Sequence, residues 1–175
     1  MTEFCDLTAT ELRQEISKGN VSPVELMESC LARIDAVNGP VNAVVAIDSE
    51  RALMEARRAE KAVRVGDASG LLHGLPLAIK DLEDTAGLRT TYGSLLYENH
   101  VPEHDHWAVA NVRAQGGIVV GKTNTPEFGA GANTRNRVYG ATGNPFDPEL
   151  TCGGSSGRGI GLFDGSAGKR IGLRR

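Results

Sequence analysis

Two short apolar segments with a helical pattern between them constrain the fold of this chain more than any other feature. Leu75 to Ile79 and Ile118 to Val120 have the continuous apolar character of buried strands. Between them, Asp105 is placed to cap a helix, and Gly116-Gly117 is placed to end it. Two strands joined through a helix form a parallel pair with a right-handed crossover. The sequence therefore predicts an α/β sheet.

The residues that precede this segment carry the start and stop signals of helices. Thr8-Ala9-Thr10-Glu11 and Ser22-Pro23-Val24-Glu25 are capping boxes, in which the first side chain accepts from a backbone N–H and the glutamate reaches back. The expected elements are a helix from Thr8 to Gly19, a helix from Ser22 to Gly39-Pro40, a short strand from Asn42 to Ile47 and a third helix capped by Ser49. Helices therefore precede the sheet.

The composition restricts the class of protein. With 175 residues, 40% of them apolar and 23% charged, the chain resembles a soluble globular protein of one domain. Its apolar runs are too short to cross a bilayer, and its N-terminus lacks a basic start and an apolar signal core. Cys5, Cys30 and Cys152 are an odd number without a CxxC spacing, which disfavours a disulfide framework or a cysteine zinc site. We expect a cytoplasmic protein with no membrane partner.

Charge is distributed unevenly along the chain. Residues 158–175 carry five basic side chains and one acidic, whereas residues 1–157 carry 14 basic and 21 acidic. An acidic body disfavours nucleic acid as the main partner. The basic tail has only Phe163 as an aromatic, so it lacks the stacking residues of a single-strand binding segment. We expect no nucleic-acid partner.

A lysine and a glycine-rich loop are the candidate catalytic features. Lys80 lies at the carboxyl end of its predicted strand, where α/β sheets place ligands, and Ser155 lies in the loop Gly153 to Gly157. A desolvated lysine has a lowered pKa, and a hydroxyl both donates and accepts a proton, so the two side chains suit a Ser/Lys hydrolytic relay without histidine or metal. Taken alone, a lysine such as Lys80 is more often a strand-end residue that reaches solvent, here beside Asp81, and a loop such as Gly153 to Gly157 is more often a flexible turn or linker.

Four ordered motifs decide between these interpretations. They are Gly74 to Asp81, Gly121 to Phe128, Gly140 to Pro145 and Gly153 to Gly157. Together with the two N-terminal helices they resemble the amidase signature family of serine hydrolases over about residues 5 to 157. The resemblance implies an α/β fold in which N-terminal helices are followed by the start of a mixed or parallel sheet, here incomplete. It also implies hydrolysis of the C–N bond of a small-molecule amide through an acyl-enzyme, with no cofactor.

The resemblance also assigns roles to individual residues. It makes Lys80 the general base and acid, and Ser155 the bridging serine, held by a cis peptide. A second serine further along the chain is the nucleophile in such families. Lys122 and Ser156 match no position of the relay, so we interpret Lys122 as structural and Ser156 as a loop hydrogen-bonding residue.

Several other groups of polar residues are alternative candidates for a functional site. His100, His104 and His106 have a spacing that a metal site could use, but their loop context disfavours it, so we expect no metal. His73 is interpreted as structural, and Glu127, without a paired carboxylate, as an ionic or capping contact. The segment Asp164 to Lys169 is similar to a phosphate-binding loop but lacks its first glycine and its final Ser/Thr, so a nucleotide site is not expected.

Residues 158–175 depart from the family pattern. No Gly-Gly-Ser turn follows residue 157, and Ser166 stands in the wrong context for a nucleophile. We therefore expect an N-terminal part of an amidase domain over 1–157, a divergent Gly/Arg-rich tail over 158–175, and negligible amidase activity of the 175-residue chain alone. A frameshift is one hypothesis, because codons for Lys169 to Arg175 exist whose frame shifted by one base reads Asn-Gly-Ser-Asp-Ser-Gly. Sequencing the gene tests it.

Two further functions remain open at this stage. One is a non-catalytic α/β fragment that acts as a binding module, and the other is an A-type amidotransferase subunit of the glutaminyl-tRNA-forming branch. The motifs do not identify the amide substrate. An incomplete sheet exposes strand edges and apolar surface, so a homo-oligomer is also possible.

Overall fold

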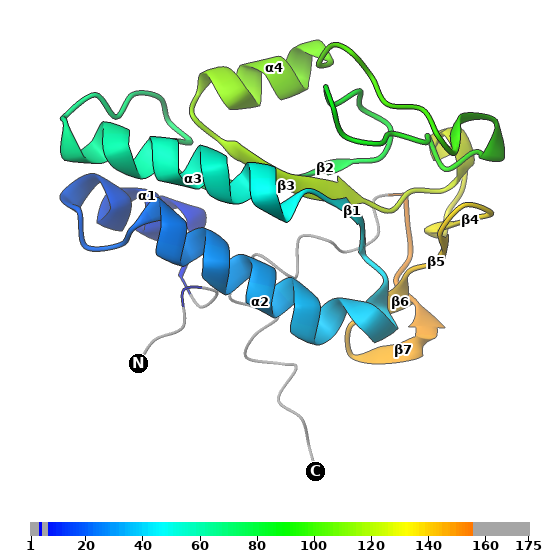
Figure 1. Ribbon diagram of the computed structural model, residues 1–175. Helices are drawn as coiled ribbons and strands as arrows, with labels where there is room; N and C mark the ends of the chain where they lie inside the picture. Colours follow the sequence, from blue (N-terminus) through cyan, green and yellow to red (C-terminus); the bar gives the residue numbers. More distant parts are fainter. Residues whose placement is uncertain (1–3, 5–6, 156–175) are drawn as a thin grey trace.

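Three helices and one strand precede the parallel strand pair of a small mixed sheet, and a fourth helix lies in the connection between the two parallel strands (Figure 1). The computed structural model describes residues 4 and 7–155. In chain order the elements are α1 (Ala9–Lys18), α2 (Pro23–Val41), β1 (Val44–Ile47), α3 (Ser49–Arg64), β2 (Pro76–Lys80), η2 (Leu95–Tyr97), α4 (Trp107–Ala114), β3 (Ile118–Thr123), η3 (Glu127–Gly129), β4 (Arg135–Asn136), β5 (Gly140–Ala141), β6 (Gly143–Asn144) and β7 (Asp147–Thr151). Within the described residues, none of the helices has the length and apolar character that a bilayer crossing requires.

The sheet contains the predicted parallel pair. Its strand order is β1-β3-β2, and β2 runs parallel to β3 while β1 runs antiparallel to it. The prediction of two parallel strands joined through a helix is confirmed. In this register Ile79 lies beside Lys122 and Lys80 lies beside Thr123. The carboxyl ends of β2 and β3 therefore lie at the same edge of the sheet.

Helices cover both faces of the sheet (Figure 1). Ile118 and Val120 pack with residues of α2 and α3, whereas Val119 packs with Val109 of α4. Successive residues of a strand point to opposite faces, so a strand covered on both sides has to be apolar throughout. Each of these fully buried aliphatic side chains contributes about 1.5–3 kcal/mol to the free energy of unfolding.

The capping boxes of the first two helices form as predicted. The side chains of Thr8 and Ser22 accept hydrogen bonds from backbone N–H groups of the first turn. In return, the carboxylates of Glu11 and Glu25 accept hydrogen bonds from the backbone N–H groups of the two cap residues. The predicted end of α2 at Gly39-Pro40 is wrong, because the helix continues to Val41. Asn42 closes the last turn by donating its N–H to Asn38 O in a left-handed conformation, with φ 51°.

Two other predicted caps are each wrong by one residue. Asp48, not Ser49, caps α3, because its Oδ1 accepts from Arg51 N at 3.0 Å. His106, not Asp105, precedes α4 as its cap. The Asp105 carboxylate is otherwise engaged, since it accepts from Ala86 N at 2.7 Å and pairs with Arg113. A tertiary contact therefore outweighs the local capping contact at this position.

Candidate active site

The two predicted relay residues lie in contact. Lys80 is the last residue of β2, and its Nζ donates to Ser155 Oγ at 2.9 Å, which joins residues 75 apart in the chain. Lys80 is partly buried, and this burial lowers the pKa of its amine below the ordinary value, with Glu83 opposing the shift. A lysine amine with a lowered pKa is closer to accepting a proton at neutral pH. The pair therefore has the geometry of a proton relay.

The backbone before Ser155 is held in one specific position. The Gly154–Ser155 peptide is cis, as the family resemblance implies. Gly153 O accepts from both Thr134 N and Thr134 Oγ1, each at 3.0 Å. A Cβ at position 154 would lie 2.8 Å from Ala132 O, closer than ordinary contact, so glycine is required for this approach.

A buried network of amides and hydroxyls supports the segment that leads to Ser155. Asn136 Nδ2 donates to Asn124 Oδ1 and to Thr125 O, both at 2.7 Å. Its Oδ1 accepts from Val138 N at 2.8 Å and from Tyr139 N at 2.7 Å. Both the nitrogen and the oxygen of the Asn136 side-chain amide are thus hydrogen-bonded, each to two groups. Four bonds on one buried side chain identify it as the centre of this region.

The residue after Lys80 is anchored on two sides. Asp81 is fully buried, and its N–H donates to Thr123 O at 2.9 Å. Its carboxylate accepts from Thr91 N at 3.0 Å and from Thr91 Oγ1 at 2.6 Å. Burial raises the pKa of Asp81, and the two bonds from Thr91 oppose that shift. The turn after β2 is therefore tied to β3 and to the loop that contains Thr91.

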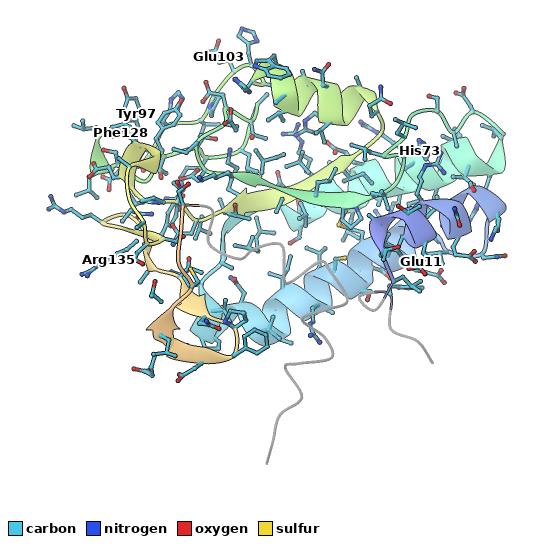
Figure 2. All side chains as sticks on the ribbon, turned by 180° about the vertical axis from the view of Figure 1, so that it is seen from behind. Glu11, His73, Tyr97, Glu103, Phe128 and Arg135 are labelled. Atoms are coloured by element: carbon cyan, nitrogen blue, oxygen red, sulfur yellow. The ribbon has the colours of Figure 1, made fainter. Side chains whose placement is uncertain are left out.

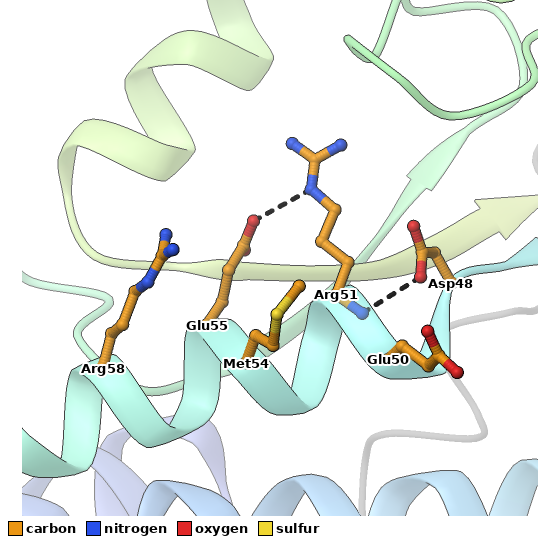
Figure 3. Close-up of a pocket in the computed structure, with 6 residues that line it drawn as sticks. All are labelled: Asp48, Glu50, Arg51, Met54, Glu55 and Arg58. Carbon is orange, nitrogen blue, oxygen red and sulfur yellow. Dashed lines mark hydrogen bonds and ion pairs between the residues drawn. The ribbon is translucent and has the colours of Figure 1, made fainter.

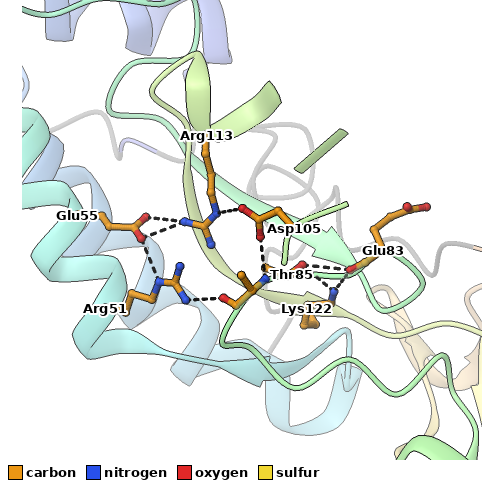
Figure 4. A network of polar contacts seen from close by, with 8 residues as sticks. Arg51, Glu55, Glu83, Thr85, Asp105, Arg113 and Lys122 are labelled. Atoms are coloured by element: carbon orange, nitrogen blue, oxygen red, sulfur yellow. Dashed lines mark hydrogen bonds and ion pairs between the residues drawn. The ribbon is translucent and has the colours of Figure 1, made fainter. Parts of the chain in front are cut away.

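Lys122 of β3 is also fully buried beside this turn. Its Nζ donates to Glu83 O and to Thr85 Oγ1 at 2.9 Å (Figure 4). It also donates to Thr90 Oγ1 at 3.0 Å. Burial lowers the pKa of Lys122 to about 8, and the carboxylate of Asp81 is the largest influence in the opposite direction. All three acceptors belong to the segment that follows Lys80.

A chain of ion pairs connects the same segment to two helices (Figure 4). Glu55 of α3 contacts Arg51 Nε at 3.1 Å and Arg113 Nη1 of α4 at 3.0 Å. Arg113 Nε lies 3.1 Å from Asp105 Oδ2, and Arg51 Nη1 donates to Ala86 O at 2.6 Å. These contacts hold α3, α4 and the turn at Ala86 together.

The hollow on the side of α3 does not belong to the relay. It is lined by residues of α3 and its cap, namely Asp48, Glu50, Arg51, Met54, Glu55 and Arg58 (Figure 3). Two of these, Arg51 and Glu55, are already engaged in the ion-pair chain. Neither Lys80 nor Ser155 lines it.

Comparison with known proteins identifies the family. Residues 25–161 match the amidase family, which is more than half of the chain. This chain belongs to the amidase family. The A-type subunit of the glutamyl-tRNA(Gln) amidotransferase of Geotalea daltonii is 43% identical over 155 residues, which cover 89% of this chain and 32% of that protein. Its counterpart in a Roseiflexus species is 43% identical over 157 residues, which cover 90% of this chain and 32% of that protein.

Solved amidase structures have the same fold over this region. The peptide amidase of Stenotrophomonas maltophilia superposes with a TM-score of 0.81 at 30% identity, over 88% of this chain and 33% of that one. Fatty acid amide hydrolase superposes with a TM-score of 0.85 at 26% identity, over 91% of this chain and 28% of that one. The prediction of a partial amidase signature fold with a mixed sheet is confirmed. The chain spans about a third of the length of the curated relatives it matches.

The other candidate residues lie outside the relay. His106 Nδ1 lies 2.9 Å from Glu83 Oε2, and His100 Nε2 lies 3.9 Å from Asp84 Oδ1. Residues 4 and 7–155 contain no group of three or more His, Cys, Asp or Glu side chains arranged for a metal ion. His73 is buried, with its ring nitrogens 3.2 Å from Ser69 O and 3.1 Å from Ala59 O, which are structural contacts.

Glu127 makes a contact between two loops. Its Oε1 accepts from Ser94 Oγ at 2.6 Å, so the contact is a hydrogen bond and not the ionic or capping contact that we predicted. Next to it, the rings of Tyr97 and Phe128 meet edge to face, far from His73 and Glu11 (Figure 2). Ser156, Ser166, the segment Asp164 to Lys169 and the rest of 156–175 lie outside the described residues.

The sequence did not reveal the residues that hold the relay in place. Thr134, Asn136, Lys122 and Asp81 all bind groups on other segments of the chain. For Asp81 and Lys122 the available signal was a charged residue next to an apolar segment, because a buried polar group requires a partner. Thr134 and Asn136 lie in a polar loop that carries no such signal. The sequence does not show which partner each of them has.

Proposed function

We propose that this chain supplies the Lys80 and Ser155 part of a serine amidase relay that cleaves the C–N bond of a carboxylic amide. The observation that supports it most is the 2.9 Å hydrogen bond from Lys80 Nζ to Ser155 Oγ. In this scheme a nucleophilic serine hydroxyl attacks the amide carbonyl and passes its proton to Ser155, which passes its own proton to Lys80. The proton then returns to the leaving nitrogen, an amine or ammonia departs, and water hydrolyses the acyl-enzyme.

The proposal divides the chain at residue 157. Residues 1–157 form the N-terminal part of the amidase domain, and residues 158–175 are the divergent segment. No Gly-Gly-Ser turn occurs after residue 157 in this sequence, so the nucleophile of the scheme is not assigned to this chain. Purified residues 1–175 are therefore expected to release no measurable ammonia from carboxamides. Hydrolysis by this chain that depends on Lys80 and Ser155 would contradict this division.

A chimera tests the proposal. Residues 1–155 replace the matching part of the Stenotrophomonas maltophilia peptide amidase, and ammonia release from a peptide amide is measured. We expect activity, and we expect Lys80→Met and Ser155→Ala each to lower kcat about a thousandfold or more, because members of a relay act as a unit. Lys61→Met and Ser17→Ala are matched controls, because both side chains are exposed.

The same chimera separates hydrolysis from a purely binding role. Labelling by a fluorophosphonate probe requires an activated nucleophile, so a complete relay labels and a non-catalytic fragment does not. The binding module would be favoured by a chimera whose circular dichroism spectrum shows that it is folded, but which is not labelled by the probe and releases no ammonia. Unchanged activity after Lys80→Met would remove Lys80 from the scheme.

A second candidate function rests on the curated relatives. Identity is 43% to the A-type amidotransferase subunit of Geotalea daltonii, against 30% to the peptide amidase. We propose as the alternative that the amide nitrogen is transferred to an acceptor instead of being released. Residues 1–155 joined to the remainder of the Geotalea daltonii protein, with its partner subunits, glutamine and glutamyl-tRNA(Gln), test this. Formation of amidated tRNA that Ser155→Ala abolishes would support transfer, and ammonia release alone would support hydrolysis.

A further inference from the structure

Lys122 is the largest fully buried side chain among the described residues, and the relay does not use it. Lysines are almost never fully buried unless their ammonium group is paired. Within residues 4 and 7–155, no carboxylate makes a hydrogen bond with Lys122 Nζ, and its three acceptors there are one carbonyl and two hydroxyls. Desolvation of such a group is costly, so its position calls for an explanation beyond simple packing.

The three acceptors lie on the chain segment that directly follows Lys80. Glu83 N donates to Lys80 O at 3.1 Å, so Glu83 closes the turn that begins at Lys80. Lys122 donates to the carbonyl of this same Glu83, and to Thr85 and Thr90 further along. One ammonium group therefore binds the last residue of the turn and two hydroxyl groups further along the same segment.

The sheet register places Lys122 beside the relay. Lys122 pairs with Ile79, the residue before Lys80, and Thr123 pairs with Lys80. On the other side of the turn, Asp81 is held by Thr91, the neighbour of Thr90. Two buried side chains of opposite charge thus fix the backbone just after Lys80, from two directions.

We propose that Lys122 is a positioning residue for Lys80, holding the turn 80–83 so that the Lys80 amine stays partly buried and directed at Ser155. The inference rests on the proposed function, because positioning matters only if Lys80 moves a proton. Removal of Lys122 would loosen the turn and admit water to Lys80. Greater exposure to water would raise the pKa of Lys80 toward its ordinary value, because burial is the main cause of its lowered pKa.

The titration of Lys80 in the 175-residue chain measures this directly. Lysine side chains are labelled with ¹³C, and the Lys80 Cε resonance, assigned by its loss in Lys80→Met, is followed by NMR against pH. We expect a midpoint below the ordinary lysine value in the unaltered chain, and a rise of about 1 pH unit in Lys122→Met. Lys61→Met is the matched control, and it should leave the Lys80 midpoint unchanged.

A second variant covers the case in which Lys122→Met does not fold. Thr85→Val removes one acceptor of Lys122 while conserving shape, and it should raise the Lys80 midpoint in the same direction by a smaller amount. Its control is Thr10→Val at an exposed position of α1. A lowered Lys80 midpoint that neither Lys122→Met nor Thr85→Val changes would overturn this inference and leave the proposed function intact. An ordinary midpoint in the unaltered chain would instead contradict the proposed function, and the inference with it.

Discussion

Lys80 and Ser155 contact each other, but the two regions that present them are built differently. Lys80 ends a strand of the sheet, and the turn after it is held by buried or half-buried charges, among them Lys122, Asp81 and Arg113. Ser155 ends a segment in which β4, β5 and β6 have two residues each, and buried amides and hydroxyls hold that segment. Ionic contacts respond to pH and salt, whereas neutral hydrogen bonds do not. The region around Lys80 should therefore be destabilised by changes of pH and salt that leave the region around Ser155 unaffected.

The largest effect is expected on the Ser155 side, from Asn136→Ala. This change removes four hydrogen bonds, two made to buried residues and two made to half-buried residues, so we expect the free energy of unfolding to fall by about 4 kcal/mol. Urea denaturation measures the loss, and hydrogen exchange should show that residues 124–155 lose protection before β2 and β3 do. Asn111→Ala, at an exposed position of α4, is the control. Equal loss of protection in the sheet would show that the two regions are not independent.

The next effect belongs to the Lys80 side and depends on pH. Burial lowers the pKa of Lys122 to about 8, whereas the unfolded chain has the ordinary value of 10.5. Between these values the unfolded state keeps the proton that the folded state has released, so this group makes the free energy of unfolding rise with pH, by up to roughly 3 kcal/mol. Urea denaturation from pH 7.5 to 10 should show the rise.

Lys122→Met should remove most of the pH-dependent rise, because the lowered pKa of Lys80 also contributes in the same direction. The comparison has to stay below pH 10, because burial also raises the pKa of Tyr139 and that group acts in the opposite direction at higher pH. A rise of equal size in Lys122→Met would mean that another group titrates.

A smaller effect is expected from the ion pairs around Arg113. Arg113→Met removes contacts to Glu55 and Asp105, and we expect a loss of about 2 kcal/mol because these groups are largely shielded from water. About a fifth of each of these side chains remains exposed, so in 1 M NaCl the loss should shrink slightly, whereas the loss from Asn136→Ala should not. Arg64→Met is the control, since Arg64 pairs with Glu60 on the surface and should change stability little. Equal salt dependence of both variants would remove the distinction between the two regions.

The smallest effect is expected from Thr134→Val, next to Ser155. The hydroxyl bond to Gly153 O is lost while the backbone bond from Thr134 N remains, so the free energy of unfolding should fall by about 1 kcal/mol. Thr10→Val, which is exposed, is the matched control. Faster hydrogen exchange at the Gly154 and Ser155 amides alone is the expected signature, and unchanged exchange there would mean that Thr134 does not hold the loop.

The sequence predicted those parts of the fold that depend on local contacts. The capping boxes at Thr8 and Ser22 join residues three positions apart, and the apolar segments of β2 and β3 require burial on both faces. The end of α2 was missed because the Asn42 side chain donates to Tyr139 O, 97 residues away. A contact between residues so far apart in the chain produces no repeating pattern in the sequence from which it could be predicted.

The candidate site divides in the same way. Lys80 and Ser155 were predicted because their motifs resemble a family, and the position of Lys80 at the end of a strand agrees with the apolar pattern before it. Lys122 was interpreted as structural, and its bond to Glu83, 39 residues away, was not predictable. Asn136 lies in a loop whose composition indicated a site without indicating which residue organises it. Buried polar residues thus mark the region, and only the tertiary structure assigns the partners.

The most direct test of the central claim is a double-mutant cycle in the chimera with the peptide amidase. Lys80→Met, Ser155→Ala and the pair are compared by kcat for amide hydrolysis at a fixed pH. If the two residues form one relay, the double variant loses no more activity than the more damaging single variant, because either change already breaks the path of the proton. Losses that multiply would show that Lys80 and Ser155 act separately, and would contradict the relay.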